Sequence, residues 1–421
     1  MIHVFKFGGA SVKDADGIKN LAKIINFNRE KQLLIVVSAM GKTTNTLENL
    51  TKSYVDRQND VFSIFDEIRT YHETILLQLF EDRNHPIYDE IANTFVEIDW
   101  IIEEEPHDEY DFIYDQIVSI GEMVASKIVN AYLRFKGIES KWLDSRSYIH
   151  TDNTYREGII DWDKTQKSIK SKIPQILENH VAVTQGFIGG TSENFTTTLG
   201  REGSDYSAAI FAACLNAKAV TIWKDVPGVL NADPKLFDDT KKYEELSYRE
   251  ALEMTFYGAT VIHPKTIKPL QNARIPLFVK PFLYPSENGT CIKEDNVSVS
   301  MPAIIVKNNQ VLLSVSTLDL SFITENHLSH LFGILADKQI KINMMQLSAS
   351  SYSVCFDNDE RRVPQLIAAL KSQFNLKYNT GLELLTIRHF NKEVISKLTS
   401  GKMILLEQSS RQTSQMVLKD A

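Results

Sequence analysis

Short apolar runs that end in glycine or a small polar residue recur through the first 290 residues of the chain. Their hydrophobicity is continuous rather than alternating, which is typical of strands buried on both faces of a parallel sheet. Helical stretches alternate with these runs, and this rhythm predicts an α/β domain. The clearest runs are 2–7, 33–37, 181–184 and 219–223, and the helical stretches are 14–28, 115–135 and 204–215.

Each apolar run is followed by small polar or charged residues. Gly8 and Gly9 follow the first run, Ser38 follows the second, Gly186 lies just after the third, and Lys224 follows the fourth. Ligands of parallel sheets bind in the crevice beyond the carboxyl ends of the strands. The sequence therefore predicts a ligand site where these residues meet.

Residues from about 45 to 115 interrupt the rhythm with helical spacing rich in acidic and aromatic residues. We interpret this segment as a helical insertion rather than core, and we assign it no chemistry. Pro, Ser, Gly, Asn and Asp cluster at 285–296, which predicts a domain boundary. The pattern beyond the boundary is strand, helix, strand, strand, helix, strand over 311–388, which indicates a separate α+β domain.

A second, shorter copy of this pattern follows to residue 421. The copy is located by aligning 344–348 with 405–409, and the shared order of elements predicts an internal repeat. The second copy stops before its last helix and strand. It therefore requires a strand from elsewhere, for which 302–307 is the candidate.

Composition limits the partners of the protein. The net charge of −8 over 421 residues argues against nucleic acid, although it does not exclude an anionic substrate. The three cysteines show no metal-ligand spacing and suit a reducing compartment. The first residues lack a signal-peptide pattern, and no apolar run reaches the roughly 18–20 residues of a membrane helix. We expect a cytoplasmic protein without a membrane partner.

The first candidate site is Lys6 with Gly8 and Gly9. Glycines let backbone N–H groups approach an anion closely, and the lysine adds positive charge. The spacing is not that of a Walker A loop, and a tight turn is the alternative interpretation.

Two further candidates lie on predicted helices. Ser204 is a predicted N-cap, and the preceding Arg201 can hold a carboxylate through two hydrogen bonds. A capped helix with a surface arginine is the alternative. Gly121 costs about 1 kcal/mol relative to Ala inside a helix, so it predicts close approach of another group beside Glu122. A glutamate on a solvated helix face is the alternative there.

Together these segments resemble the aspartate kinase family within the wider amino-acid kinase superfamily. The resemblance runs in order through KFGGASV, VVSAMGKTTN, SIGE, TQGFIGG, GREGSDYSAA, KDVPGVLNADPK, GATVIHPKT and IPLFVK. It implies a three-layer αβα catalytic domain over 1–290, with the aspartate side mainly in 1–200 and the ATP side mainly in 200–290. The tail, 300–421, resembles the ACT regulatory modules that this family carries in pairs.

The resemblance implies ATP- and Mg²⁺-dependent phosphorylation of the side-chain carboxylate of L-aspartate, the first step toward lysine, threonine, methionine and isoleucine. Lys6 and Asp205 would be catalytic, with Lys6 held in place by Asp205. Aspartate would be bound by Thr44, Glu122, Arg201, Glu202, Gly203 and Ser204, and the nucleotide by Lys6, Gly8, Gly9, Ser38, Lys224, Asp225, Leu230, Lys235, Thr260 and Val261.

The chemistry of aspartate agrees with this assignment. Its ammonium requires an anion, which Glu122 supplies, and its α-carboxylate requires a cation, which Arg201 supplies. The side-chain carboxylate is already a nucleophile at neutral pH, so catalysis reduces to positioning and neutralisation of phosphoryl charge. We expect no metal-ligand set in the chain itself.

The chain departs from the family pattern mainly on the nucleotide side. Thr260 replaces a lysine and Lys224 a threonine, so we hypothesise that Lys224 restores the charge lost at Thr260. The alternative is a relaxed nucleotide site that binds ATP more weakly. Leu230 replaces a tyrosine, Lys235 replaces an arginine, and Glu202 replaces a glycine.

One position in the tail bears on the identity of the effector. Asn343 stands where lysine-inhibited relatives carry an acidic residue in a loop, which favours an effector such as threonine, or loss of feedback. Pairing of ACT modules predicts a homodimer, and no homoserine dehydrogenase domain is expected. The alternatives are another acid-directed kinase, of glutamate or acetylglutamate, and a non-catalytic amino-acid sensor. The pair Glu122 and Arg201 favours a free amino acid.

Overall fold

The structure, a computed structural model, describes residues 1–259, 262–294, 301–319 and 321–420. These residues form two compact units. The first contains Met1–Val229 and Lys242–Leu252 together with the described residues from 262 to 294. The second contains Leu230–Lys241, the described residues from 253 to 259 and those from 301 onward.

The first unit is built on an eight-stranded sheet in the order β3-β4-β2-β1-β7-β9-β10-β8. Neighbouring strands are parallel except for the antiparallel pair β9–β10. The four predicted strands and the α/β class are confirmed. The strands are β1 (Ile2–Phe7), β2 (Gln32–Val37), β3 (Ser140–Leu143), β4 (Val181–Gln185), β7 (Ala219–Lys224), β8 (Glu245–Ser247), β9 (Leu277–Pro281) and β10 (Thr290–Lys293).

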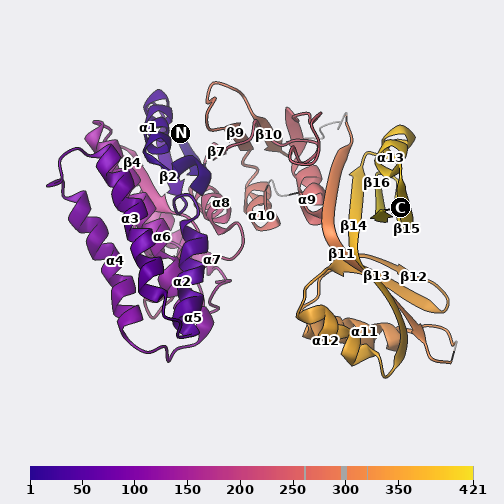
Figure 1. Cartoon of the computed structure of the whole chain (residues 1–421). Helices are drawn as coiled ribbons and strands as arrows, with labels where there is room; N and C mark the ends of the chain where they lie inside the picture. The colour runs from indigo at the N-terminus through magenta and orange to yellow at the C-terminus, as the bar shows by residue number, and fades with distance from the viewer. Residues whose placement is uncertain (260–261, 295–300, 320, 421) are drawn as a thin grey trace. The chain divides into compact units, whose positions relative to one another are not determined.

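Helices cover the sheet to complete the αβα layers (Figure 1). A small antiparallel hairpin, β5 (Ile188–Gly190) and β6 (Thr196–Thr198), lies outside the sheet. The helices are α1 (Ala15–Phe27), α2 (Thr43–Val55), α3 (Val61–Leu79), α4 (Ile87–Glu103), α5 (Tyr110–Val118), α6 (Ile120–Phe135), α7 (Trp162–Leu177), α8 (Gly203–Leu215), α9 (Tyr248–Tyr257) and α10 (Pro264–Asn272), with short 3₁₀ turns at Gly9–Val12 and Ser145–Ser147.

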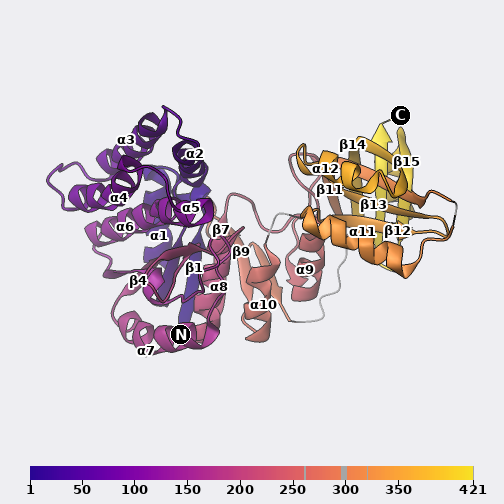
Figure 2. The ribbon, with the colours of Figure 1, turned by 90° about the horizontal axis from the view of Figure 1, so that it is seen from below.

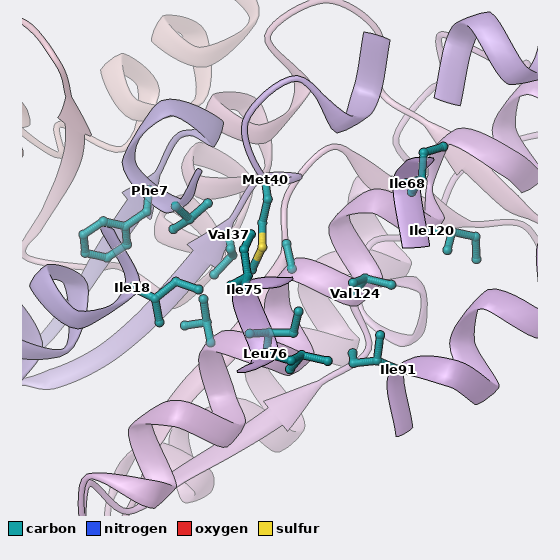
Figure 3. Packing of buried hydrophobic residues seen from close by; sticks show 14 of the residues in the cluster. Phe7, Ile18, Val37, Met40, Ile68, Ile75, Leu76, Ile91, Ile120 and Val124 are labelled. Carbon is teal, nitrogen blue, oxygen red and sulfur yellow. The ribbon is translucent and has the colours of Figure 1, made fainter. Parts of the chain in front are cut away.

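The segment 45–115 is helical, as predicted, but it is part of the main core rather than outside it. Leu76 of α3 and Ile91 of α4 belong to the same buried cluster as Phe7 of β1 and Val37 of β2 (Figure 3). Burial of each such side chain contributes about 1.5–3 kcal/mol. The helices α2–α5 are therefore integral to the stability of this unit.

The predicted helix over 115–135 is divided into α5 and α6 at Ser119. Ser119 keeps helical dihedral angles. The hydrogen bond from its backbone N–H to the Asp115 carbonyl is long, at 3.4 Å. No helix among the described residues is long and apolar enough to cross a membrane.

The second unit is an antiparallel sheet in the order β12-β13-β11-β14-β16-β15. Helices α11 and α12 lie side by side against it (Figure 2). A separate apolar cluster beneath α13 packs on β14 and β16. The elements are β11 (Ala303–Thr317), α11 (Glu325–Asp337), β12 (Ile342–Leu347), β13 (Ser351–Asp357), α12 (Arg362–Leu370), β14 (Phe374–Arg388), α13 (Lys392–Thr399), β15 (Lys402–Ser409) and β16 (Thr413–Asp420).

The two copies of the repeat share their long strands. The amino-terminal part of β11 pairs with the carboxyl-terminal part of β14, from Ala303 with Arg388 to Lys307 with Leu384. The strand that the second copy requires is therefore supplied by this segment, as predicted.

The predicted alignment of the two copies is wrong by one residue. Both edge strands contain an irregularity, between Ile342 and Met344 in β12 and between Ile404 and Leu406 in β15. Met344 therefore corresponds to Leu406, whereas the sequence alignment had matched it to Leu405. A one-residue slip exchanges the two faces of a strand, and only the pairing reveals it.

Two segments that the sequence analysis assigned to the first domain make their contacts in the second unit. The Ile304 N–H donates to the Asn231 carbonyl at 2.7 Å. The Arg388 guanidinium lies 3.1 Å from the Glu253 carboxylate. Residues 230–241 and 253–259 therefore pack with the six-stranded sheet.

Candidate active site

Two lysines and one aspartate meet at the carboxyl ends of the central strands. Lys6 is the penultimate residue of β1, and Lys224 is the last residue of the neighbouring β7. Lys6 is in register with Ile222, and side chains alternate along a strand, so Lys224 projects from the same face as Lys6. Asp205 comes from the first turn of α8, which packs on β1 and β7.

The Asp205 carboxylate is fully buried and contacts both ammonium groups. Its Oδ1 atom lies 2.7 Å from Lys6 Nζ, and its Oδ2 atom lies 3.6 Å from Lys224 Nζ. Burial alone would raise the pKa of Asp205, but the two nearby cations outweigh it and hold this pKa below its usual value. The three groups together carry a net positive charge, which suits binding of phosphoryl oxygens.

Glu122 is a buried carboxylate in the first turn of α6. Its Oε1 atom accepts a hydrogen bond from the Ala39 N–H at 3.1 Å, whereas Oε2 has no partner among the described residues. Burial raises the pKa of Glu122 to about 8. Gly121 permits the contact, because a Cβ atom there would lie 3.0 Å from the Ala39 Cβ and 3.1 Å from Leu47. The predicted close approach at Gly121 is confirmed.

These groups line one cavity of about 840 Å³. The predicted residues that line it come from the ends of β1 and β2, from α2 and α6, and from the loop that leads into α8. They are Lys6, Gly9, Ser38, Thr44, Glu122, Arg201, Glu202, Gly203, Ser204 and Asp205.

The remaining predicted residues do not line this cavity. Gly8 adjoins it, because a Cβ atom built there would lie 3.4 Å from Lys6 Nζ. Lys224 contacts Asp205, and Asp225 is exposed after β7. Leu230 and Lys235 belong to the second compact unit, and Thr260 and Val261 lie outside the described residues. Their contacts with nucleotide stay predictions.

The helical segment also contributes to the cavity, contrary to the sequence interpretation. Glu48 of α2 and Asp111 and Tyr114 of α5 line it, together with Arg156 from the loop before α7. The Tyr114 hydroxyl donates to Glu48 at 2.5 Å. The Arg156 guanidinium lies 4.5 Å above the Tyr114 ring and 3.1 Å from Asp111. These side chains form an ordered polar wall that the sequence analysis missed.

Asp115 holds this wall to the hairpin. Its carboxylate accepts bonds from the Arg156 N–H at 2.8 Å, the Thr198 N–H at 2.9 Å and the Thr198 hydroxyl at 2.7 Å. Burial raises the pKa of Asp115 to about 6, even though these three bonds oppose the shift. Asp115 is thus a positioning residue for two segments that line the cavity.

The start of α8 differs from the prediction. The N-cap is Glu202, not Ser204, and it adopts a left-handed conformation with φ of 57° and no side-chain cap. That conformation costs a residue with a Cβ atom roughly 1–2 kcal/mol. Ser204 instead lies in the first turn of the helix and packs tightly against Gly186. A Cβ atom built on Gly186 would lie only 2.5 Å from the Cβ atom of Ser204.

A parallel-sheet αβα unit with lysines and a buried carboxylate at the carboxyl ends of its strands defines a class of proteins that bind small anionic ligands at that edge of the sheet. Residues 1–281 match the model of the amino acid kinase family. The chain belongs to this family, and within it to the aspartokinases.

The aspartokinase assignment rests on relatives over nearly the whole chain. Lysine-sensitive aspartokinase 3 of Escherichia coli K12 is 30% identical, over 92% of this chain and 86% of that protein. The bifunctional aspartokinase/homoserine dehydrogenase 2 of Arabidopsis thaliana is 29% identical over 90% of this chain, which spans only 43% of that protein. The crystal structure of E. coli aspartokinase III in complex with aspartate and ADP superposes with a TM-score of 0.84, at 27% identity, covering 99% of this chain and 96% of that one.

Proposed function

We propose that this protein transfers the γ-phosphoryl group of ATP to the side-chain carboxylate of L-aspartate. One observation carries the proposal: Glu122 has a buried oxygen with no partner in the part of the chain that the structure describes, and it lines the same cavity as Lys6 and Asp205. A buried polar atom requires a partner, and the ammonium of a free amino acid supplies one. The related E. coli enzyme with aspartate and ADP bound supports the same substrates.

The cavity can orient aspartate by its two backbone charges. The ammonium would bind Glu122, and the α-carboxylate would bind Arg201, which lines the mouth of the cavity in an exposed position. The side-chain carboxylate would then point toward Lys6. This arrangement disfavours an acetylated amino acid, because its nitrogen carries no charge to satisfy Glu122.

The reaction requires no general base. An oxygen of the ionised side-chain carboxylate attacks the γ-phosphorus, and the bond from that phosphorus to the β,γ-bridging oxygen breaks. ADP leaves with the electron pair, and the products are 4-phospho-L-aspartate and ADP. Lys6, held by Asp205 at 2.7 Å, would neutralise charge on the phosphoryl oxygens.

We expect Mg²⁺ to enter the site bound to the phosphates of the nucleotide. The part of the chain that the structure describes holds no group of three His, Cys, Asp or Glu side chains able to bind a metal. Mg²⁺ commonly takes its ligands from phosphates and water. It would supply further neutralisation of phosphate charge beside Lys6.

A hydroxamate assay tests the proposal, because hydroxylamine traps an acyl phosphate. We expect product with aspartate, ATP and Mg²⁺, and much less with glutamate or N-acetylglutamate. Glu122→Gln should raise the KM for aspartate by about 10–100-fold, since a charged hydrogen bond contributes roughly 1.5–3 kcal/mol. The matched control is Glu30→Gln on the surface. Activity with another acid alone would refute the substrate, and no activity with any acid would favour a sensor.

We further propose that the second unit binds an amino-acid effector with a neutral side chain. Asn343 lies in β12 rather than in a loop, which corrects the sequence interpretation. Its Oδ1 atom accepts from Lys307 Nζ at 2.9 Å, and its Nδ2 donates to Gln310 at 2.8 Å. An ammonium group therefore already contacts Asn343. Titration of activity with lysine, threonine and methionine tests this, and inhibition by lysine alone would contradict it. The structure of E. coli aspartokinase III in complex with lysine and aspartate makes lysine the effector to test first.

We infer that the protein is a cytoplasmic homodimer. The strands β12 and β15 lie at the two ends of the six-stranded sheet. Both carry exposed apolar side chains, Met345 and Leu347 on β12 and Met403 and Ile404 on β15. Edge strands of this kind favour pairing with another chain. Sedimentation equilibrium should give twice the mass of the chain, and a monomer at micromolar concentration would refute the inference.

A further inference from the structure

A second cavity, of about 770 Å³, lies on the first unit over strands β1, β7 and β9, with α1 forming one wall. Its volume is within the roughly 300–1,000 Å³ of small-molecule pockets. Alternate residues of each strand line it: His3 and Phe5 of β1, Thr221 and Trp223 of β7, and Phe278 and Lys280 of β9.

This cavity is separate from the active site. His3 and Phe5 alternate with Val4 and Lys6 along β1, so they project from the opposite face of the sheet. The cavity also extends to the amino end of the sheet, because His3 is in register with Ala219, the first residue of β7. Lys6 is at the other end of the strand.

The floor of the cavity is aromatic. The Trp223 ring stacks on Phe7 with an interplanar angle of 4° and meets Phe5 edge-on at 5.7 Å. Its indole Nε1 is buried and has no partner among the described residues, although a buried indole N–H usually finds one. Phe27 on α1 also lines the cavity while 82% exposed. The floor therefore offers ring surfaces to a ligand.

Basic groups converge above this floor. No carboxylate lies within 4.0 Å of Lys31 or Lys280 among the described residues, and Lys280 Nζ lies 5.8 Å from the Trp223 ring centre. Burial, followed by the charge of Lys31, lowers the pKa of Lys280, and the same two causes lower the pKa of His3 to about 4. A bound anion would relieve this mutual repulsion.

The acidic residues at the cavity do not cancel this charge. Glu244 lies 3.2 Å from Lys242 Nζ, and Glu245 lies 3.0 Å from Lys293 Nζ. Both carboxylates are therefore paired with lysines of their own. The surplus charge of the cavity is positive.

We propose that this cavity binds a small planar aromatic carboxylate, with its ring against Trp223 and Phe278 and its carboxylate near Lys280 and Lys31. Aromatic surface favours a ring. Among the described residues the Lys31 ammonium donates to the Asn28 side chain at 2.5 Å, and neither Lys31 nor Lys280 contacts a carboxylate, so the two cations favour an anion. The site is independent of the proposed kinase activity.

The probe is naphthalene-2-carboxylate, titrated into the full chain by calorimetry. We expect saturable binding, at least about tenfold weaker binding of the neutral 2-naphthamide, and a similar loss for cyclohexanecarboxylate, which lacks the ring. Lys280→Met removes the charge and keeps most of the stem, and it should weaken binding by about tenfold. Lys141→Met, at an exposed position of β3, is the matched control and should bind normally. Equal binding of acid and amide, or an unaltered affinity in Lys280→Met, would refute the proposal.

Two measurements locate the ligand and guard against misfolding. Cys291 lines the cavity and is partly exposed, whereas Cys214 and Cys355 are buried. The probe should slow iodoacetamide labelling of Cys291, and unchanged labelling would place the ligand elsewhere and overturn the proposal. Ala219→Phe should fill the cavity and abolish binding, with circular dichroism confirming the fold. Full binding by folded Ala219→Phe would also refute it.

Discussion

The ammonium group of Lys224 lies 3.6 Å from the Oδ2 atom of Asp205, while the Oδ1 atom of the same carboxylate pairs with Lys6 at 2.7 Å. One buried carboxylate thus fixes two lysines from adjacent strands. The hypothesis that Lys224 supplies phosphate-binding charge gains support from this geometry, because the Lys224 side chain is directed toward Asp205 and Lys6. The position of Thr260 lies outside the described residues.

Asp205→Asn should damage both stability and catalysis. Removing a fully buried charge that contacts two largely buried lysines should lower the free energy of unfolding by about 3–5 kcal/mol. The loss of Lys6 orientation should lower kcat at least about 100-fold. Denaturant unfolding and the hydroxamate assay measure the two effects. Asp16→Asn, which breaks an exposed pair with Lys19, is the control and should change stability by less than about 1 kcal/mol.

Lys224→Met should raise the KM for ATP by about 10–100-fold with a smaller effect on the KM for aspartate, because a charged contact with phosphate contributes roughly 1.5–3 kcal/mol. Steady-state kinetics with each substrate varied in turn measures the two KM values separately. Lys235→Met removes a lysine that lies in the second unit and tests the other predicted nucleotide position. Unchanged kcat and ATP KM in Lys224→Met would end the compensation hypothesis.

The strands, and the side chains at their carboxyl ends, could be predicted from the sequence. Lys6 and Lys224 could be predicted as neighbours because continuous apolar runs identify parallel strands, whose carboxyl ends meet. Glu48 and Tyr114 could not be found in this way. A polar residue on an amphipathic helix has the same pattern whether it faces water or a cavity, and only the packing of α2 against α5 distinguishes the two.

The left-handed backbone conformation of Glu202 also could not be predicted from the sequence. A serine before an apolar run is the usual N-cap signal, so Ser204 was the natural choice. The chain instead turns through a left-handed residue at Glu202, which places Ser204 inside the helix against Gly186. The close approach to Gly186 comes from a strand end that is remote in sequence, so no local pattern could indicate it.

Aspartate binding should release a proton from Glu122. The pKa of this group in the free protein is about 8, so at pH 7 most molecules carry it protonated, and pairing with the substrate ammonium requires the ionised form. Affinity should therefore increase by up to about tenfold per unit as the pH rises toward 8, and then level off. Calorimetry in buffers of different ionisation enthalpy counts the proton. Glu122→Gln should abolish both the release and the slope, and persistence of either would contradict this role.

The raised pKa of Glu122 also predicts how the stability of the substrate-free protein depends on pH. The folded pKa of Glu122 is above its usual 4.5, so between pH 4.5 and 8 the folded protein binds more protons at this site than the unfolded chain. The contribution of Glu122 to the free energy of unfolding is therefore fully present below pH 4.5 and is lost as the pH rises through 8. Denaturant unfolding of wild type and Glu122→Gln from pH 6 to 8.5 measures the difference, which should favour the variant increasingly as pH rises.

Replacement of Glu202 should separate strain from charge at the entrance to the site. Glu202→Gly removes the left-handed strain, and part of that gain is offset by the greater entropy of glycine in the unfolded chain, so we expect up to about 1 kcal/mol of added stability. Both Glu202→Gly and Glu202→Gln remove a negative charge beside Arg201, so both should lower the KM for the anionic substrate aspartate. Only Glu202→Gly should raise Tm. An equal rise of Tm in Glu202→Gln would show that charge repulsion, rather than backbone conformation, limits the stability of this turn.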